Sequence, residues 1–213
     1  MRKKMRIKWW ALILSVLLLS APLCSCSSEP PPLEDVRERF VQLIEDSQEI
    51  NDIFFGEGLP TYARDSKENE ILYYGFFGYD AYEIVRADCP YQNVSQIKEQ
   101  AEGVYSKQYL DDIYVMAFDG YADENSDKVT TARYLHAGEY FLKYAQGEED
   151  PFRFLPGKRL YRYDTMEIGA LSSEEAVNLE IDSYLEGDED NVLRVTLRFV
   201  LQNGEWYLDT PTY

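Results

Sequence analysis

The sequence predicts an α+β fold in which N-terminal helices pack on a curved antiparallel β-sheet. Between Val36 and Ile50, apolar residues recur every three or four positions with charged residues between them, which is typical of an amphipathic helix. From Leu193 to Leu201 every second residue is apolar, which is typical of a strand with one buried face. Asn203-Gly204 then favours the type I′ turn of an antiparallel hairpin.

The first half of the chain is expected to be mainly helical. Helices are predicted at residues 34–48, 93–105 and 106–116. The first is ended by Gly56 and Gly58, the second is capped by Asn93 or Ser95, and the third is capped by Ser106.

Strands are expected on both sides of the later helices. Two tyrosine-rich segments, Ile71–Tyr74 and Ala81–Arg86, are predicted to pair as a hairpin because Gly75, Gly78 and Asp80 separate them. An acidic loop at residues 119–127 precedes the second half of the chain. Further strands are predicted there at Thr131–His136, Glu139–Tyr144, Leu160–Ile168, Ala176–Leu185, Val192–Gln202 and Glu205–Asp209.

The N-terminus has the three parts of a signal peptide: a basic start, an apolar run from Trp9 to Leu19, and a stretch of small residues. The apolar run of about 11 residues is too short to be a permanent transmembrane helix, which needs roughly 20. Three consecutive prolines within Ser27–Leu33 favour an extended spacer. We therefore expect a signal peptide at residues 1–25, a lipidated cysteine with a proline-rich tether at 26–33, and one acidic α+β extracytoplasmic domain at 34–213.

The segment Leu23-Cys24-Ser25-Cys26 resembles the lipobox of bacterial lipoproteins. Leu23 is the large aliphatic residue, Ser25 is the small residue before the cleavage site, and Cys24 departs from the usual pattern. Cleavage before Cys24 would place Leu23 where a small residue is needed. The resemblance implies a diacylglyceryl thioether on Cys26 and a lipid-anchored protein on the extracytoplasmic face of the membrane. An ordinary secretory leader is the alternative.

The chain is strongly acidic. Removal of residues 1–25 takes away five of the 21 basic residues and none of the 39 acidic ones, which lowers the formal net charge from −18 to −23. The 18 tyrosines and 10 phenylalanines argue against disorder. This charge disfavours nucleic acid and anionic lipid headgroups as partners and favours basic ones. The alternative is that the charge only keeps an exported protein soluble.

Residues suited to catalysis are few. The single histidine, His136, lies in a predicted strand, where a structural or exposed role is the usual one. Cys89 is a weak nucleophile candidate because the preceding Asp88 disfavours its thiolate. It is also the only cysteine left after processing, so it has no intramolecular disulfide partner. Paired carboxylates for glycoside hydrolysis would have to come from Asp111, Asp112, Asp164 or Glu167.

Metal ligands are also scarce. Asp123, Asn125 and Asp127 have the alternating spacing of a calcium loop. However, Lys128 replaces the turn glycine, and Tyr134 stands where a bidentate carboxylate is needed. We regard these three residues as weak calcium candidates, and expect no cofactor and no catalytic residues.

Two segments resemble the secreted DL-endopeptidase inhibitors of cell walls. Asn93–Tyr114, with Ile97-Lys98, Val104-Tyr105-Ser106 and Tyr109-Leu110, is similar to their helical stretch, and Asn203–Tyr213 to their C-terminal strand and tail. The resemblance implies a non-enzymatic protein that docks on and blocks a peptidoglycan-cleaving hydrolase. A final Asn-Gly hairpin followed by an aromatic residue also occurs in NTF2-like and cystatin-like domains, which set a helix against a curved sheet.

These observations favour a membrane-anchored extracytoplasmic lipoprotein of the cell envelope that acts as a protein-binding module and inhibits a cell-wall hydrolase. A basic hydrolase or another envelope protein would be its partner. An NTF2-like domain that binds a small ligand in a closed apolar cavity is the first alternative, and a hydrolase with two facing carboxylates is the second.

Lipidation at Cys26 can be tested by metabolic labelling. Radiolabelled palmitate is expected to enter the wild-type protein and not the Cys26→Ala variant, because the thioether forms on that sulfur. Equal labelling of the two proteins would contradict the assignment.

Overall fold

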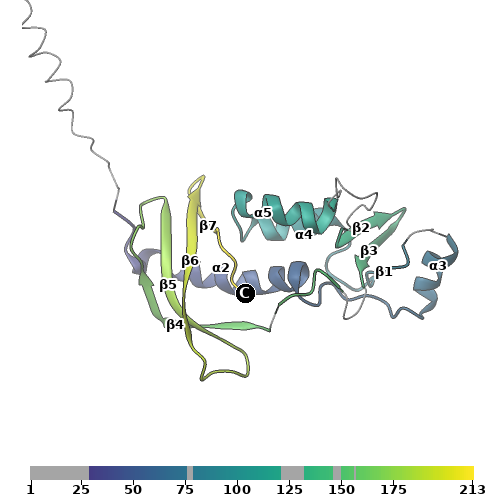
Figure 1. Ribbon diagram of the computed structural model, residues 1–213. Coiled ribbons are helices and arrows are strands. Elements are labelled where there is room, and N and C mark those ends of the chain that lie inside the picture. The colour runs from purple at the N-terminus through teal and green to yellow at the C-terminus, as the bar shows by residue number, and fades with distance from the viewer. Residues whose placement is uncertain (1–28, 76–78, 121–131, 146–149, 156) are drawn as a thin grey trace, which may run out of the picture.

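The computed structural model describes residues 29–75, 79–120, 132–145, 150–155 and 157–213. It shows an α+β fold with the long helix α2 (Leu33–Phe55) at its centre. A four-stranded antiparallel sheet packs along the N-terminal part of α2, and a separate three-stranded sheet lies beyond its C-terminal end (Figure 1). In the described part of the chain, no helix is long and apolar enough to cross a membrane.

Helix α2 confirms the amphipathic pattern. Glu34 and Asp35 lie in its first turn, where the helix dipole favours negative charge. Gly56 is its C-cap residue, as the sequence predicts. The face turned to the core carries the residues Val36, Phe40, Leu43, Ile44, Ser47, Ile50, Asn51, Ile53, Phe54 and Phe55.

The predicted strand at Ile71–Tyr74 is wrong, because these residues belong to helix α3 (Lys67–Gly75). Ser66 Oγ accepts the backbone N–H of Asn69, and two acidic residues in the first turn suit the helix dipole. Leu72 is buried whereas Ile71 is 39% exposed. Local capping therefore overrides the strand propensity of the tyrosines.

Strand β1 (Tyr82–Ile84) lies within the predicted segment but has a different partner. It pairs with β3 (Tyr140–Tyr144), which also pairs with β2 (Tyr134–Ala137), in the order β1-β3-β2. The predicted hairpin with Ile71–Tyr74 is therefore not formed.

The other helices follow their predicted caps. Helix α4 (Val94–Glu102) begins after Asn93, whose side chain accepts the Gln96 N–H. Helix α5 (Lys107–Tyr114) begins after Ser106, whose hydroxyl accepts the Tyr109 N–H, and continues into the π-helical turn η1 (Val115–Asp119). Both helices lie over the C-terminal half of α2 (Figure 1).

The four-stranded sheet has the simple order β4-β5-β6-β7. Its strands are Arg159–Ile168, Ala176–Leu185, Leu193–Gln202 and Glu205–Leu208. Positive φ angles of 54° at Asn203 and 85° at Gly204 confirm the predicted type I′ turn between β6 and β7. The sequence predicts a single sheet, and the structure has two, because alternation reveals a buried face but not a strand's partner.

The interface between α2 and this sheet is filled by aromatic rings. Phe40 stacks on Phe199 with ring centroids 3.8 Å apart, and Trp206 meets Phe40 edge-on at 5.4 Å. The buried face of β6 is shorter than the alternation predicts, since Leu193 at its start is 50% exposed.

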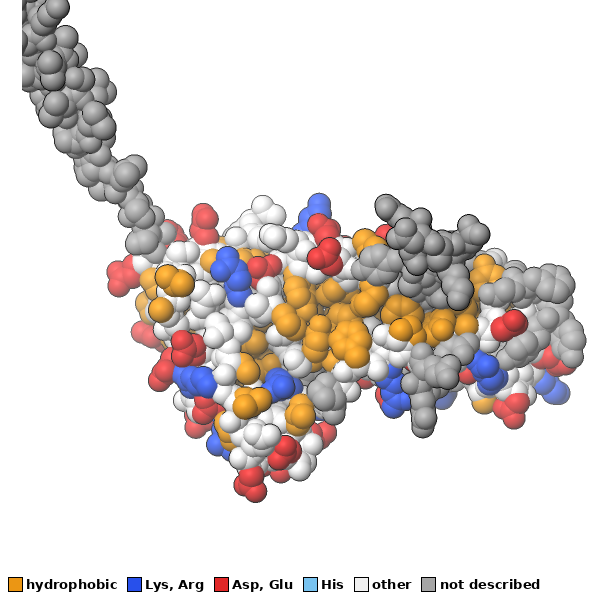
Figure 2. Space-filling view, viewed as in Figure 1, with side chains coloured by type: hydrophobic (Ala, Val, Ile, Leu, Met, Phe, Trp, Pro, Cys, Tyr) orange, Lys and Arg blue, Asp and Glu red, His pale blue; other side chains and the backbone are white. Residues whose placement is uncertain are grey.

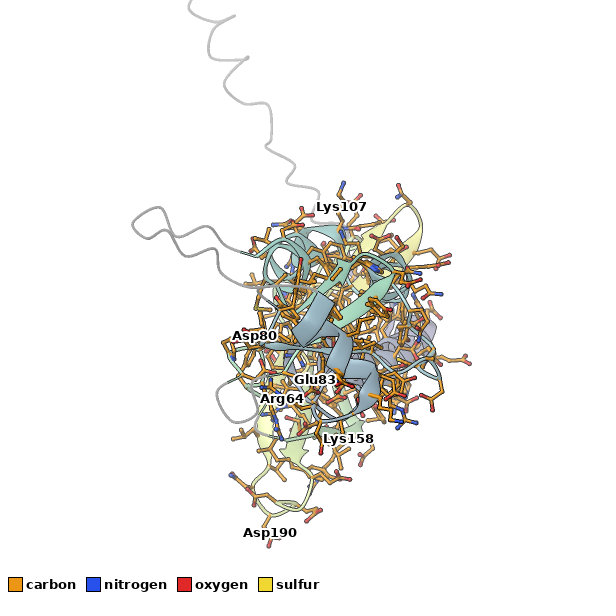
Figure 3. The ribbon with its side chains drawn as sticks, turned by 90° about the vertical axis from the view of Figure 1, so that its right-hand side faces the viewer. Arg64, Asp80, Glu83, Lys107, Lys158 and Asp190 are labelled. Carbon is orange, nitrogen blue, oxygen red and sulfur yellow. The ribbon has the colours of Figure 1, made fainter. Side chains whose placement is uncertain are left out.

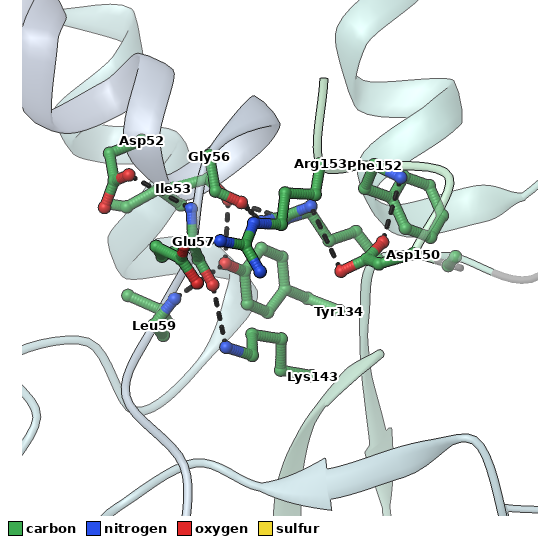
Figure 4. Close-up of polar contacts among 12 residues, drawn as sticks. Asp52, Ile53, Gly56, Glu57, Leu59, Tyr134, Lys143, Asp150, Phe152 and Arg153 are labelled. Atoms are coloured by element: carbon green, nitrogen blue, oxygen red, sulfur yellow. Dashed lines mark hydrogen bonds and ion pairs between the residues drawn. The ribbon is translucent and has the colours of Figure 1, made fainter. Parts of the chain in front are cut away.

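The C-terminal end of α2 is capped by the small sheet. The buried Arg133 donates from Nε to the Ile53 carbonyl at 2.7 Å and from Nη2 to the Gly56 carbonyl at 2.6 Å. Tyr134 Oη also donates to the Ile53 carbonyl, and Lys143 Nζ donates to the Glu57 carbonyl (Figure 4). Burial and the nearby Arg133 both lower the pKa of Lys143.

Loss of Arg133 should destabilise the protein. Arg133→Met leaves the Gly56 carbonyl without its side-chain donor and removes one of the two side-chain donors to the Ile53 carbonyl. It is expected to cost about 2 to 4 kcal/mol of unfolding free energy in urea titrations.

The matched control is Arg64→Met, which removes an ion pair with Glu83 at 3.6 Å. These two residues lie at the end of the molecule that carries the small sheet (Figure 3), and the Arg64 side chain is 48% exposed. The control should cost less than about 1 kcal/mol. Equal losses in both variants would show that Arg133 has no special role.

Candidate functional site

The C-terminal tail after β7 is fixed by a buried polar network centred on Thr212. Its hydroxyl lies 2.6 Å from Ser47 Oγ and accepts a hydrogen bond from Asn51 Nδ2 at 2.7 Å. Its carbonyl accepts a hydrogen bond from Tyr161 Oη at 2.8 Å. Tyr105 Oη joins the network by donating to Asn51 Oδ1 at 2.7 Å. The tail therefore has a defined position across α2.

This anchoring places Tyr213 in an aromatic cluster on the surface. Its ring centroid is 4.9 Å from that of Phe55 and 6.1 Å from that of Phe154. The rings of Phe55 and Phe154 lie 5.0 Å apart. Phe154 is 50% exposed. Large aromatic surface that stays in contact with water is a common mark of binding sites.

The cluster forms one wall of a groove of about 500 Å³, and helix α5 and η1 form the opposite wall. We call this groove the aromatic groove; its lining residues are Phe55, Gln108, Tyr109, Asp112, Ile113, Met116, Phe154, Asp209 and Tyr213. Hydrophobic side chains form a band across the middle of this face of the molecule (Figure 2). Burial raises the pKa of Tyr109 well above its usual value, so this hydroxyl is neutral.

The charged residues of the aromatic groove are acidic. Asp209 accepts hydrogen bonds from Ser106 Oγ and from Arg198 Nε, the latter at 3.2 Å. Asp112, by contrast, is exposed, and no described cation lies within ion-pair distance of it. The groove thus combines an apolar floor with an unneutralised carboxylate at its rim.

The structure does not bring the candidate nucleophile and base together. Cys89 is buried in the main core, whereas His136 is exposed on β2, where its ring stacks on Phe141 at 5.0 Å.

The candidate carboxylates are also separated. Asp111 and Asp112 lie on α5, while Asp164 and Glu167 lie on β4, and Figure 1 shows these elements apart. Neighbouring residues on a helix face different directions, so Asp111 and Asp112 do not form a facing pair. Glu167 is neutralised by Arg194 at 2.6 Å. A two-carboxylate hydrolase site is not assembled from these four residues.

The weak calcium candidates Asp123, Asn125 and Asp127, and the lipidation candidate Cys26, lie outside the described residues. Within the described ranges, no three His, Cys, Asp or Glu side chains are grouped so as to hold a metal ion. Tyr134, the twelfth position of the calcium pattern, is buried, and its hydroxyl bonds the end of α2.

No protein family matches this chain, and no curated protein matches it in sequence. The resemblance to hydrolase inhibitors and to bacterial lipoproteins therefore stays a prediction.

Sequence reasoning missed the aromatic groove, because its residues come from α2, α5, η1, a loop and the C-terminal tail. The sequence offers only a weak indication of the groove, because its aromatic residues Phe154 and Tyr213 lie outside any periodic pattern. Nothing in their spacing indicates that they meet.

Burial of Tyr105, a member of the Thr212 network, should make the protein less stable in alkali. Burial raises the pKa of Tyr105 to about 12, from a usual value of about 10, although hydrogen bonds to Thr212, Ser47 and Asn51 oppose part of the rise. The neutral form is therefore favoured by folding. Its contribution to stability is complete below about pH 10 and is lost as pH rises towards about 12.

Urea unfolding at a series of pH values from about 9 to about 11.5 tests this. Above pH 10 the unfolding free energy should fall, and in Tyr105→Phe the slope should be smaller by up to about 1.4 kcal/mol per pH unit, the value for one proton. The unfolding free energy of the variant should still fall with pH, because other buried tyrosines also have raised pKa values. An unchanged slope in the variant would contradict the assignment.

Proposed function

We propose that this protein is a membrane-anchored extracytoplasmic lipoprotein that binds a basic partner protein in its aromatic groove. The observation that carries the proposal is an open groove lined by aromatic and aliphatic side chains, in which the two charged lining residues are carboxylates. It lies in a chain whose processed form has a formal net charge of −23.

The apolar floor supports a protein ligand. Partly exposed Phe154 and Tyr213 form the kind of rigid aromatic surface that carries most of the binding energy at interfaces. A leucine or aromatic side chain of the partner would fill the groove and exclude water from it. The Thr212 network keeps the groove in shape before binding, which lowers the entropic cost of association.

The charge pattern supports a basic partner. Asp112 at the rim would pair with a lysine or arginine beside the partner's apolar anchor. The acidic surface as a whole would attract a basic protein over longer distances and raise the association rate, with an effect that salt screens.

The position of the groove suits a tethered protein. The proposed tether precedes Leu33 at the start of α2, whereas Phe55 lies at its end. At about 1.5 Å per residue, the helix separates the two by roughly 33 Å. A groove at that distance from the lipid anchor would be open to a partner in the cell wall. The resemblance to hydrolase inhibitors makes a peptidoglycan-cleaving hydrolase the partner class to test first.

Partner binding can be tested with the purified full-length protein in detergent micelles and cell-wall extract. A basic protein, identified by mass spectrometry, should be retained at about 50 mM salt and released at about 500 mM. Phe154→Ala should weaken its binding by about tenfold or more, because the variant removes the exposed aromatic anchor.

Leu193→Ala is the matched control, since Leu193 is also 50% exposed but lies on β6, outside the groove lining. It should bind like the wild type. Equal weakening in both variants, or partner binding that salt does not affect, would contradict the proposal.

A further inference from the structure

A second pocket, of about 560 Å³, lies on the other side of the C-terminal tail from the aromatic groove. Tyr213 lines both. We call it the polar pocket; its lining residues are Gln48, Glu49, Asn51, Asp52, Gly56, Glu57, Arg153, Leu155, Gly157, Lys158, Arg159, Thr212 and Tyr213. Its size is within the range of small-molecule sites.

Three cations from a short basic segment line the polar pocket, together with three carboxylates. Arg153, Lys158, Arg159 and Arg162 fall within ten residues that contain no Asp or Glu, in a chain with 39 acidic and 21 basic residues. The first three of these four line the pocket, and the fourth does not. Such a segment is unusual in so acidic a protein, and its role depends on the groups that these cations contact.

Each of the three carboxylates of the polar pocket has a partner, but only Glu57 is paired with a cation. Glu49 accepts a hydrogen bond from Tyr91 Oη at 3.0 Å, and Asp52 accepts the Glu57 N–H at 3.1 Å. The Glu57 carboxylate pairs with Arg153. Two of the three pocket cations are therefore left without a carboxylate among the described residues.

Arg159 and Lys158 keep donors that no described residue accepts. Arg159 donates from Nη1 to Ser183 Oγ at 3.0 Å, and its backbone is fixed by pairing with β5 and by Gln48 Nε2 at 3.4 Å from its carbonyl. Lys158 forms no ion pair with any described residue. Both residues line the pocket, and guanidinium and ammonium groups with unused donors are the usual ligands of carboxylate and phosphate groups.

We propose that the polar pocket binds a small organic anion, with its carboxylate or phosphate group on Arg159 and Lys158 and its apolar part against Leu155 and Tyr213. The charged groups that would hold the anion, Arg159 and Lys158, do not line the aromatic groove, whereas Tyr213 lines both sites. Variants of the two cations therefore test anion binding separately from partner binding.

Calorimetric titration of the full-length protein in detergent micelles tests the proposal. The probes are N-acetylphenylalanine, which carries a carboxylate, and phenyl phosphate; their relative affinities distinguish the two anion classes. N-acetylphenylalaninamide is the neutral control. At least one anion should bind about tenfold or more tightly than the amide, and Arg159→Gln should weaken that binding by about tenfold or more.

Two further variants make the result specific. Lys158→Gln, on an exposed residue whose loss should not affect folding, is expected to weaken binding in the same direction. Arg162→Gln removes a cation from the same basic segment but outside the pocket, where Arg162 bonds the Glu189 carbonyl, and it should bind like the wild type. The proposal is overturned if neither anion binds, if the amide binds equally well, or if Arg162→Gln weakens binding as much as Arg159→Gln.

Discussion

The C-terminal end of α2 is the point on which the rest of the structure depends, because its local C-cap leaves two carbonyls to be bonded from elsewhere in the chain. Gly56 has φ −103° rather than a left-handed conformation, and the last turn contains no basic residue. The carbonyls of Ile53 and Gly56 are instead bonded by the buried Arg133, whose charge also opposes the negative end of the helix dipole. The small sheet is thus held to the long helix by polar contacts as well as by packing.

The same helix end positions both candidate sites. The carbonyl of Phe55 accepts the backbone N–H groups of Phe154 and Leu155, at 3.0 and 3.3 Å. These two hydrogen bonds fix the position of the segment 153–155. Within it, Phe154 lines the aromatic groove, whereas Arg153 and Leu155 line the polar pocket. This segment and Tyr213 therefore contribute residues to both sites, which differ in their chemistry.

The two surfaces differ because charges are neutralised differently in each. Three cations and three carboxylates line the polar pocket, and only Arg153 and Glu57 among them form an ion pair, whereas at the aromatic groove Asp112 has no described cation near it. The net charge of the chain does not predict which ligand either site would bind, because interactions at contact distance depend on which local groups remain unpaired. It governs only the long-range attraction of a basic partner, while the apolar floor of the groove would determine how long that partner stays bound.

By itself the sequence determined the helices, most strands, the β6–β7 turn and the acidity, because each depends on neighbours in the chain. Asn93 and Ser106 cap helices locally, and alternation shows which face of β6 is buried. Local signals conflicted only at 71–74, where capping overrode tyrosine strand propensity. Tertiary structure alone decided that there are two sheets and that Phe55, Phe154 and Tyr213 meet, because no periodic pattern relates residues so far apart in the chain.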